Sequence, residues 1–217
     1  MSMHRRIRTT SLALALTSFG MLWAAQGAEA QVAWDAPMLV APGSPPGLGI
    51  HLVDPEGDGV GALVTWRSQP FPVGIGFRAG LFDGNRSDLG LTAGIDLGGA
   101  LYRGSDETPV DVVWFTGVGL GIDDGALLSV PLGVSAGWVF ADEQVAFRPY
   151  VAPRMVLDAY LDDDGPGEGR GRDDDLDLDA AIELGADLAF SSNFIIRAAA
   201  SFGGRDAVSI GVGLPGR

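Results

Sequence analysis

Acidic side chains recur at alternate positions near the end of this sequence, where carboxylates could pair with arginines or line a channel. Between Leu176 and Phe190, the acids Asp177, Asp179, Glu183 and Asp187 occupy odd positions, and large apolar residues or alanine occupy the even ones. The other alternating stretches place their charges in the same way, opposite the large apolar residues. The charged residues on this polar parity are Arg67, Arg78, Arg148, Arg154, Arg197, Asp96, Asp111, Asp158, Asp177, Asp179, Glu183 and Asp187. Because opposite charges at close range form charge-assisted hydrogen bonds, we predict a mutually neutralising ion network. The lining of a small-solute pore is the alternative.

Two acidic clusters could bind a divalent cation. Asp162-Asp163-Asp164-Gly165 and Asp173-Asp174-Asp175 offer carboxylate oxygens, which are hard ligands. Their spacing is not that of a helix-loop-helix calcium site, in which aspartates alternate before a glycine. We therefore predict a solvated acidic loop over 161–175 and no metal site. Cation bridging from this loop to lipid phosphates is a hypothesis.

His51 is the one histidine beyond the first thirty residues, and histidine is the usual general base of hydrolases. Barrel-borne lipid hydrolases and proteases use a histidine with a serine and an acid. Two positions after His51, however, stands Val53 rather than a serine. The glycines of Gly74-Ile75-Gly76 sit inside an expected strand and open no helix, so they predict no nucleotide site. We predict no enzyme, no catalytic residue and no cofactor.

The elements that position these residues are strands, because the alternation has a period of two. Ten alternating runs are present, at Leu48 to Val53, Val60 to Arg67, Val73 to Leu81, Leu89 to Tyr102, Val110 to Ile122, Leu127 to Phe140, Val145 to Tyr160, Leu176 to Phe190, Phe194 to Phe202 and Ala207 to Leu214. Short connections rich in Gly, Asn, Asp and Pro favour antiparallel hairpins. The prediction is an all-β, antiparallel, up-and-down barrel of about ten strands, or eight if the first two pair loosely.

The two faces of these strands differ in a way that favours a membrane barrel. One face carries large apolar residues such as Ile95, Leu97 and Trp138, whereas the opposite face is rich in glycine and single charges. A membrane barrel turns its apolar face to lipid and its polar face to the lumen. We therefore predict a transmembrane barrel with a narrow lumen. A soluble exported barrel that binds a small apolar ligand in its core is the alternative.

The N-terminal thirty residues have the pattern of a secretory signal peptide. Arg5, Arg6 and Arg8 precede an apolar stretch, and Ala28-Glu29-Ala30 is a small-x-small cleavage site. Residues 31–47 hold four prolines and no alternation, which predicts an extended periplasmic leader that makes few contacts. Residues 48–217 form the predicted barrel domain.

Aromatic residues on the apolar parity lie beside the turns that follow even-numbered strands. They are Trp66, Trp138, Phe140, Phe147, Phe190 and Phe194. Such residues form girdles at membrane interfaces, so this end of the barrel is predicted to face the periplasm and the acidic loop the exterior.

The composition bears on partners. The formal net charge is −14, which excludes nucleic acid as an expected partner because a phosphate backbone needs clustered positive charge. The chain has no cysteine, so the fold depends on sheet hydrogen bonding and packing. The expected partner is the lipid of the bacterial outer membrane.

In these patterns the stretch from Leu48 to the end resembles the small bacterial outer-membrane β-barrel families, of the OmpA-like, OmpX-like and OmpW-like kind. The resemblance implies a porin-like barrel in the outer membrane that the barrel-assembly machinery inserts. Such families commonly end in an aromatic residue that helps this machinery to recognise the chain. This sequence departs from that pattern, because its last strand ends at Leu214 and Pro215-Gly216-Arg217 follows.

Overall fold

The computed structural model describes residues 34–55, 60–68, 73–83, 89–122, 126–161, 176–191 and 193–216. Strands dominate this part of the chain. Their bounds are β1 Gly47–Pro55, β2 Gly61–Arg67, β3 Gly74–Asp83, β4 Leu89–Tyr102, β5 Val110–Ile122, β6 Ala126–Trp138, β7 Phe140–Ala141, β8 Ala146–Tyr160, β9 Leu176–Ser191, β10 Phe194–Gly203 and β11 Ala207–Pro215. No helix long and apolar enough to cross a membrane occurs among these residues.

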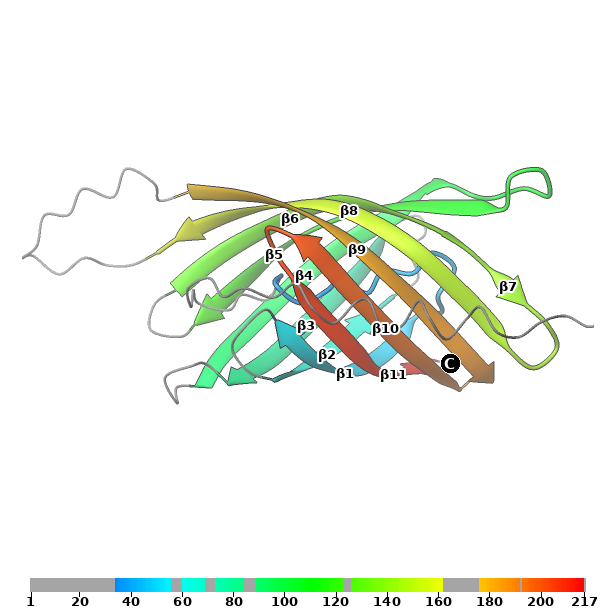
Figure 1. The fold of residues 1–217 in the computed structure, drawn as a ribbon, viewed down its shortest axis with the longest axis horizontal. Helices are drawn as coiled ribbons and strands as arrows, with labels where there is room; N and C mark the ends of the chain where they lie inside the picture. The colour runs from blue at the N-terminus through cyan, green and yellow to red at the C-terminus, as the bar shows by residue number, and fades with distance from the viewer. Residues whose placement is uncertain are drawn as a thin grey trace, which may run out of the picture.

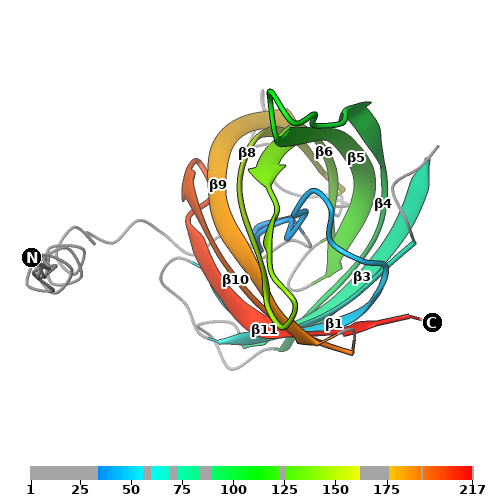
Figure 2. The same cartoon turned by 90° about the vertical axis from the view of Figure 1, so that its right-hand side faces the viewer.

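The strands close into an antiparallel barrel (Figures 1 and 2). Each long strand pairs with the next long strand along the chain, β6 with β8 across the short β7, and β1 pairs with β11, so that ten long strands form a ring. The two-residue β7 pairs only with β8. β1 pairs with β2 from Gly47, opposite Arg67, to Val53, opposite Gly61. It pairs with β11 along its whole length. The prediction of ten strands is confirmed, and the eight-stranded alternative is wrong because this pairing is complete.

Strand bounds follow the alternation of the sequence closely. β4 and β5 have the predicted ends, whereas the predicted run from Leu127 to Phe140 divides into β6 and β7 at Val139. The turn after β7 is held by Asp142, whose carboxylate accepts the backbone N–H groups of Gln144 and Val145 at 2.8 Å each. These hydrogen bonds lower the pKa of Asp142, because they favour the charged form.

The outer and inner faces have the inverted polarity that the sequence predicts. Leu184 and Ile95 are 52% and 45% exposed on the outside, whereas Glu183 and Asp96 are 0% and 5% exposed inside. Large apolar residues are exposed on the outward face of all ten long strands. A soluble barrel requires the opposite arrangement, so the structure does not favour that alternative.

Aromatic side chains gather on the outward face at one end of the barrel. The six predicted girdle residues, Trp66, Trp138, Phe140, Phe147, Phe190 and Phe194, are all exposed. Phe140 stacks on Phe147 across the β7–β8 pair, with ring centroids 6.4 Å apart. The rings of Trp66 and Phe77 are 5.7 Å apart on β2 and β3.

Residues 34–46, before β1, lie inside the barrel. In Figure 2 this blue segment runs within the ring of strands. Trp34, Ala36 and Met38 are completely buried, and Leu39 is 3% exposed. The prediction that the leader makes few contacts is therefore wrong for residues 34–46. Its apolar side chains and backbone are shielded by the lumen wall, which removes them from water.

Several predicted features lie outside the described residues. The signal peptide, residues 1–30, is one of them, and the acidic clusters at 162–164 and 173–175 are another. The assignment of residues 1–30 to a signal peptide and the periplasmic location of the leader remain predictions.

Candidate functional site

The candidate site is the lumen surface that holds residues 34–46, which we call the plug. At its centre, Glu183 on β9 is fully buried and accepts the backbone N–H groups of Met38 at 2.5 Å and Leu39 at 2.8 Å. The hydroxyl of Tyr150 on β8 donates to the same carboxylate at 2.6 Å. A buried carboxylate is tolerated when donors surround it, so these three bonds satisfy Glu183 and fix the plug at one point.

Three arginines of the wall bind the plug through its carbonyl oxygens. Arg67 on β2 donates to the carbonyls of Leu39 at 2.8 Å and Met38 at 2.6 Å. Arg78 on β3 donates to the Met38 carbonyl at 3.1 Å, and Arg154 on β8 donates to the Ala36 carbonyl at 3.1 Å. These contacts, like those of Glu183, are made with backbone atoms, so they hold a peptide chain in place without reading its side chains.

Both ends of the plug are tied to charged residues of the wall. At one end, Asp35 accepts a hydrogen bond from Arg205, in the turn between β10 and β11. Arg205 also binds Asp158 on β8 and lies 3.3 Å from Asp179 on β9.

Towards the other end, the plug binds a second ion pair of the wall. The Ser44 hydroxyl donates to Asp187 at 2.5 Å and accepts from Arg197 at 2.7 Å. The Nε of Arg197 lies 3.2 Å from the same Asp187 carboxylate. At the barrel end itself, the N–H of Gly216 donates to the Pro46 carbonyl at 2.9 Å. The plug is thus attached from the end where β1 begins to the turn between β10 and β11.

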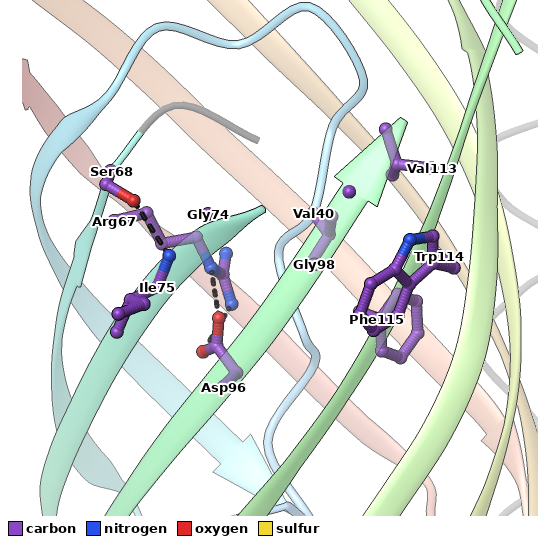
Figure 3. A pocket seen from close by; sticks show the side chains of 11 residues that line it. Val40, Arg67, Ser68, Gly74, Ile75, Asp96, Gly98, Val113, Trp114 and Phe115 are labelled. Atoms are coloured by element: carbon purple, nitrogen blue, oxygen red, sulfur yellow. Dashed lines mark hydrogen bonds and ion pairs between the residues drawn. The ribbon is translucent and has the colours of Figure 1, made fainter. Parts of the chain in front are cut away.

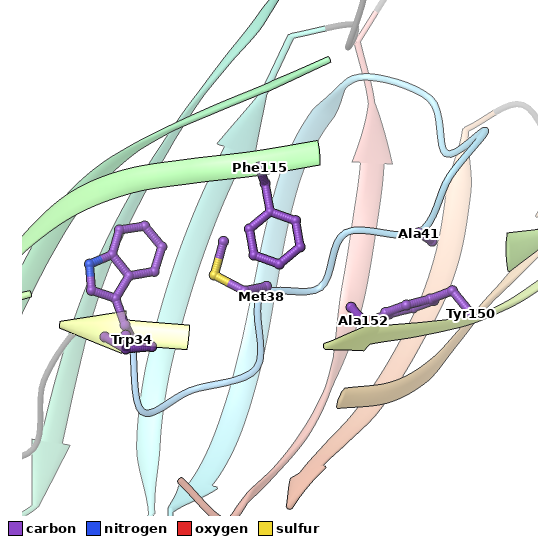
Figure 4. Packing of buried hydrophobic residues seen from close by; sticks show 7 residues of the cluster. Trp34, Met38, Ala41, Phe115, Tyr150 and Ala152 are labelled. Atoms are coloured by element: carbon purple, nitrogen blue, oxygen red, sulfur yellow. The ribbon is translucent and has the colours of Figure 1, made fainter. Parts of the chain in front are cut away.

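Apolar packing supplements these polar contacts (Figure 4). Trp34 and Met38 of the plug form a buried cluster with Phe115 on β5 and with Tyr150 and Ala152 on β8. The Arg78 guanidinium carbon lies 4.4 Å from the centre of the Trp34 ring, a cation–π contact.

Glycines of the wall make room for the plug. A β-carbon at Gly94 on β4 would lie 3.1 Å from the Trp34 ring, and one at Gly117 on β5 would lie 3.0 Å from it. A β-carbon at Gly137 on β6 would lie 3.1 Å from Pro42. The glycine-rich inner face predicted from the sequence therefore leaves room for the plug as well as for the side chains of the wall.

A small cavity of about 40 Å³ remains beside the plug (Figure 3). Val40 of the plug borders it together with Arg67, Asp96 and Phe115 of the wall. A space of this size holds a few water molecules and no larger ligand. We therefore regard it as a wet gap in the lumen.

Most of the predicted inward charges are in the lumen. Arg78, Arg154, Arg197, Asp96, Asp158, Glu183 and Asp187 are buried there, and Arg67 pairs with Asp96. Arg148 lies opposite Asp187 in the β8–β9 register. Asp111 accepts the Gly104 N–H at 2.8 Å at the start of β5, and Asp177 is exposed at the start of β9. The ion network is real, but several of its arginines bind the plug backbone as well.

The residues whose sequence patterns resemble those of hydrolases make structural contacts in the lumen. His51 is buried in the lumen, and its Nε2 lies 3.3 Å from the Thr65 hydroxyl. Ser135 lies within a Gly-x-Ser-x-Gly stretch, residues 133–137, but this stretch is inside β6 and its hydroxyl donates to the Val40 carbonyl at 2.6 Å. A nucleophile elbow requires a sharp turn from a strand into a helix, so this stretch does not have the required geometry.

Several contributors to this site were not predicted from the sequence. Among them are Arg205 and Tyr150 of the wall. Asp35, Ser44 and Trp34 were placed in a leader with few contacts. A signal was present, because residues 34–41 are mostly apolar and would be costly to leave in water. In the part of the chain that the structure describes, no group of three or more His, Cys, Asp or Glu residues is placed to hold a metal.

No protein-family model and no curated protein matches the sequence. Among solved structures, a bacterial polysaccharide outer membrane secretin aligns with a TM-score of 0.46 and 9% identity over 76% of this chain and 58% of that chain. A KdgM porin aligns with a TM-score of 0.39 and 8% identity over 78% of this chain and 99% of that chain. A de novo designed transmembrane β-barrel aligns with a TM-score of 0.33 and 15% identity over 79% of this chain and 96% of that chain. The chain thus spans 58% of the secretin's length. These are distant likenesses of fold.

The fold and the site define the class as a closed ten-stranded antiparallel β-barrel with an apolar exterior and an N-terminal segment bound in a charged lumen. Within that class, the resemblance to OmpA-like, OmpX-like and OmpW-like proteins remains a prediction.

Proposed function

We propose that this protein is an outer-membrane β-barrel with a structural or interaction role, whose lumen is closed by the plug and by the Arg/Asp/Glu network around it. The observation that carries the proposal is the inversion of polarity, in which residues such as Leu184 and Ile182 are half exposed outside and Glu183 between them is buried. An exterior of this kind is stable against hydrocarbon and would aggregate in water.

The closed ring of strands supports the same proposal. Every strand of the ring pairs on both sides, so the barrel offers no open sheet edge within its wall. In lipid, each unpaired backbone N–H or C=O group costs several kcal/mol, because no water is present to bind it. A closed barrel is therefore one of the few folds that can span a bilayer. The aromatic residues at one end fit an interface with lipid headgroups.

The proposed partners are the lipids of the outer membrane and, during insertion, the barrel-assembly machinery. We propose no enzymatic activity: the Nε2 of His51 lies beside the Thr65 hydroxyl, and the Ser135 hydroxyl donates to the Val40 carbonyl of the plug.

Fractionation of cells that express the full chain tests the proposal. We expect the protein in the outer-membrane pellet, where it should resist washing with carbonate. Recovery in the soluble periplasmic fraction would reject the proposal and favour an exported barrel that binds an apolar ligand.

A further inference from the structure

At its polar contacts, the plug binds groups of the wall that water could equally well bind. Glu183 accepts N–H groups of the plug, and Arg67 and Arg154 donate to its carbonyls. Water offers the same donors and acceptors as a peptide backbone, so it can replace the plug at each of these positions. A lumen lined in this way would fill with water when the plug leaves, whereas an apolar lumen would resist wetting.

The backbone hydrogen bonds of the barrel wall do not depend on the plug. The ring of strands is closed by strand pairs alone, and the described part of the plug contains no strand. The ion pairs Arg67–Asp96 and Arg197–Asp187 join residues of the wall to each other. Withdrawal of the plug therefore leaves the barrel ladder and these pairs in place.

The plug also follows the length of the lumen. Pro46 is bonded to Gly216 at the end where β1 begins, and Asp35 is bonded to Arg205 at the turn between β10 and β11. A peptide chain in a sheet occupies roughly 5 by 10 Å in cross-section. Withdrawal of the plug would thus leave a continuous passage wide enough for hydrated ions and small solutes.

One point of the plug is held in a strained conformation. Leu39 has a φ of 58°, in the left-handed region that residues with a β-carbon seldom adopt, and its N–H is bonded to Glu183. The Glu183 carboxylate therefore acts as a latch, because it stabilises a backbone conformation that the free chain would leave.

We propose that residues 34–46 are a displaceable plug latched by Glu183, and that the lumen conducts small ions and solutes when the plug is withdrawn. This inference rests on the proposed function, because conduction requires insertion into a membrane. It adds a transport activity that is silent in the plugged state.

The test uses the chain without its predicted signal peptide, reconstituted in lipid vesicles and planar bilayers in KCl, beside a variant that lacks residues 31–45. Flotation with the vesicles reports insertion separately from conduction. We expect the full chain to float and to remain almost silent, and the deletion variant to float and to conduct steadily.

A synthetic peptide of residues 31–46 provides a reversal of the deletion. Added to the deletion variant, it should block the current, because the wall binds backbone atoms that the free peptide also carries. The same peptide with Leu39→Pro should fail to block, since proline lacks the N–H that Glu183 accepts and cannot reach a φ of 58°.

A point variant covers the case in which the deletion prevents folding. Glu183→Ala in the full chain removes the latch, and we expect the fraction of time spent open to rise about tenfold, since bonds to a charged group are lost. Thr92→Ala is the matched control, because Thr92 is 4% exposed in the lumen and its hydroxyl has no hydrogen-bond partner among the described residues.

The outcomes separate the two proposals. A full chain that does not float contradicts the proposed function. A deletion variant that floats and is silent overturns the plug, as does a full chain that conducts as freely as the deletion variant. If the deletion variant does not fold, a Glu183→Ala protein that floats and opens no more often than Thr92→Ala overturns it.

Discussion

Arg67 on β2 and Asp96 on β4 form a bidentate ion pair across the intervening strand, with nitrogen–oxygen distances of 3.1 and 3.2 Å. The pair holds the guanidinium so that its remaining N–H groups point to the carbonyls of Met38 and Leu39. The ion network of the wall thus orients the groups that bind the plug.

Removing one partner of this pair should be costly. Arg67→Ala leaves the Asp96 carboxylate buried without its bidentate donor, and we expect the free energy of unfolding to fall by about 3 kcal/mol. Arg67→Lys keeps the charge but not the paired geometry, so its loss should be smaller. Urea unfolding in lipid vesicles measures both. Equal stability of Arg67→Ala and the parent chain would show that the pair contributes nothing.

The cost of a charge on the outer face should depend on its depth in the bilayer. Ile182, near the middle of β9, is 52% exposed on the outside, and Ile182→Arg should destabilise the barrel by roughly 2–4 kcal/mol. Leu176→Arg, at the end of the same strand, should cost at most about 1 kcal/mol. Asp187→Arg, on the inner face, should disturb the lumen charges instead. Reversible unfolding in vesicles gives these differences, and equal costs at positions 182 and 176 would contradict the membrane assignment.

Trp34 should be a major contributor to the binding of the plug. Its ring is fully buried against Met38 and Phe115, and the guanidinium of Arg78 lies over it. Trp34→Ala should lower the free energy of unfolding by about 3 kcal/mol, the usual cost of truncating a buried aromatic residue, and Trp34→Phe should cost less. Trp34 fluorescence, in a chain whose other tryptophans are phenylalanine, should resist quenching by acrylamide. Ready quenching would place the ring in water.

Two glycines of β4, Gly94 and Gly90, differ in the space around them, so their alanine variants test how tightly the plug is packed. Gly94→Ala brings a methyl group to 3.1 Å from the Trp34 ring and from the Val118 carbonyl, so it should destabilise by about 1–3 kcal/mol through overpacking. At Gly90 the nearest atoms would be 3.8 Å away, so Gly90→Ala should be neutral or slightly stabilising. Thermal unfolding of the two variants compares them directly, and the reverse order would contradict the described packing.

The Asp142 carboxyl group should titrate below the ordinary range of aspartic acid. Its pKa is lowered because the N–H groups of Gln144 and Val145 donate to the charged form. The support that this group gives to the turn should therefore be full above the ordinary pKa of about 4 and lost as the pH falls through the lowered value. The amide proton shifts of Gln144 and Val145 should follow the same midpoint in NMR spectra. In Asp142→Ala that transition should disappear.

The sequence alone determined the ring of strands and the direction of its faces. Alternation between residues such as Ile182 and Glu183 is local, and a period of two assigns each residue to one side of a strand whatever the strand pairs with. For that reason the ten strands, the inward charges and the outward aromatic residues could be predicted.

The content of the lumen was decided only by the tertiary structure. Residues 34–46 have no period that reports a partner, and their bonds to Glu183 and Arg205 join positions far apart in the chain, 170 residues apart for Asp35 and Arg205. Such contacts depend on the closure of the barrel, which brings β2, β3, β8 and β9 around one segment. Since the contacts with Glu183, Arg67, Arg78 and Arg154 use backbone atoms of the plug, no pattern of polar side chains in residues 34–46 could predict them.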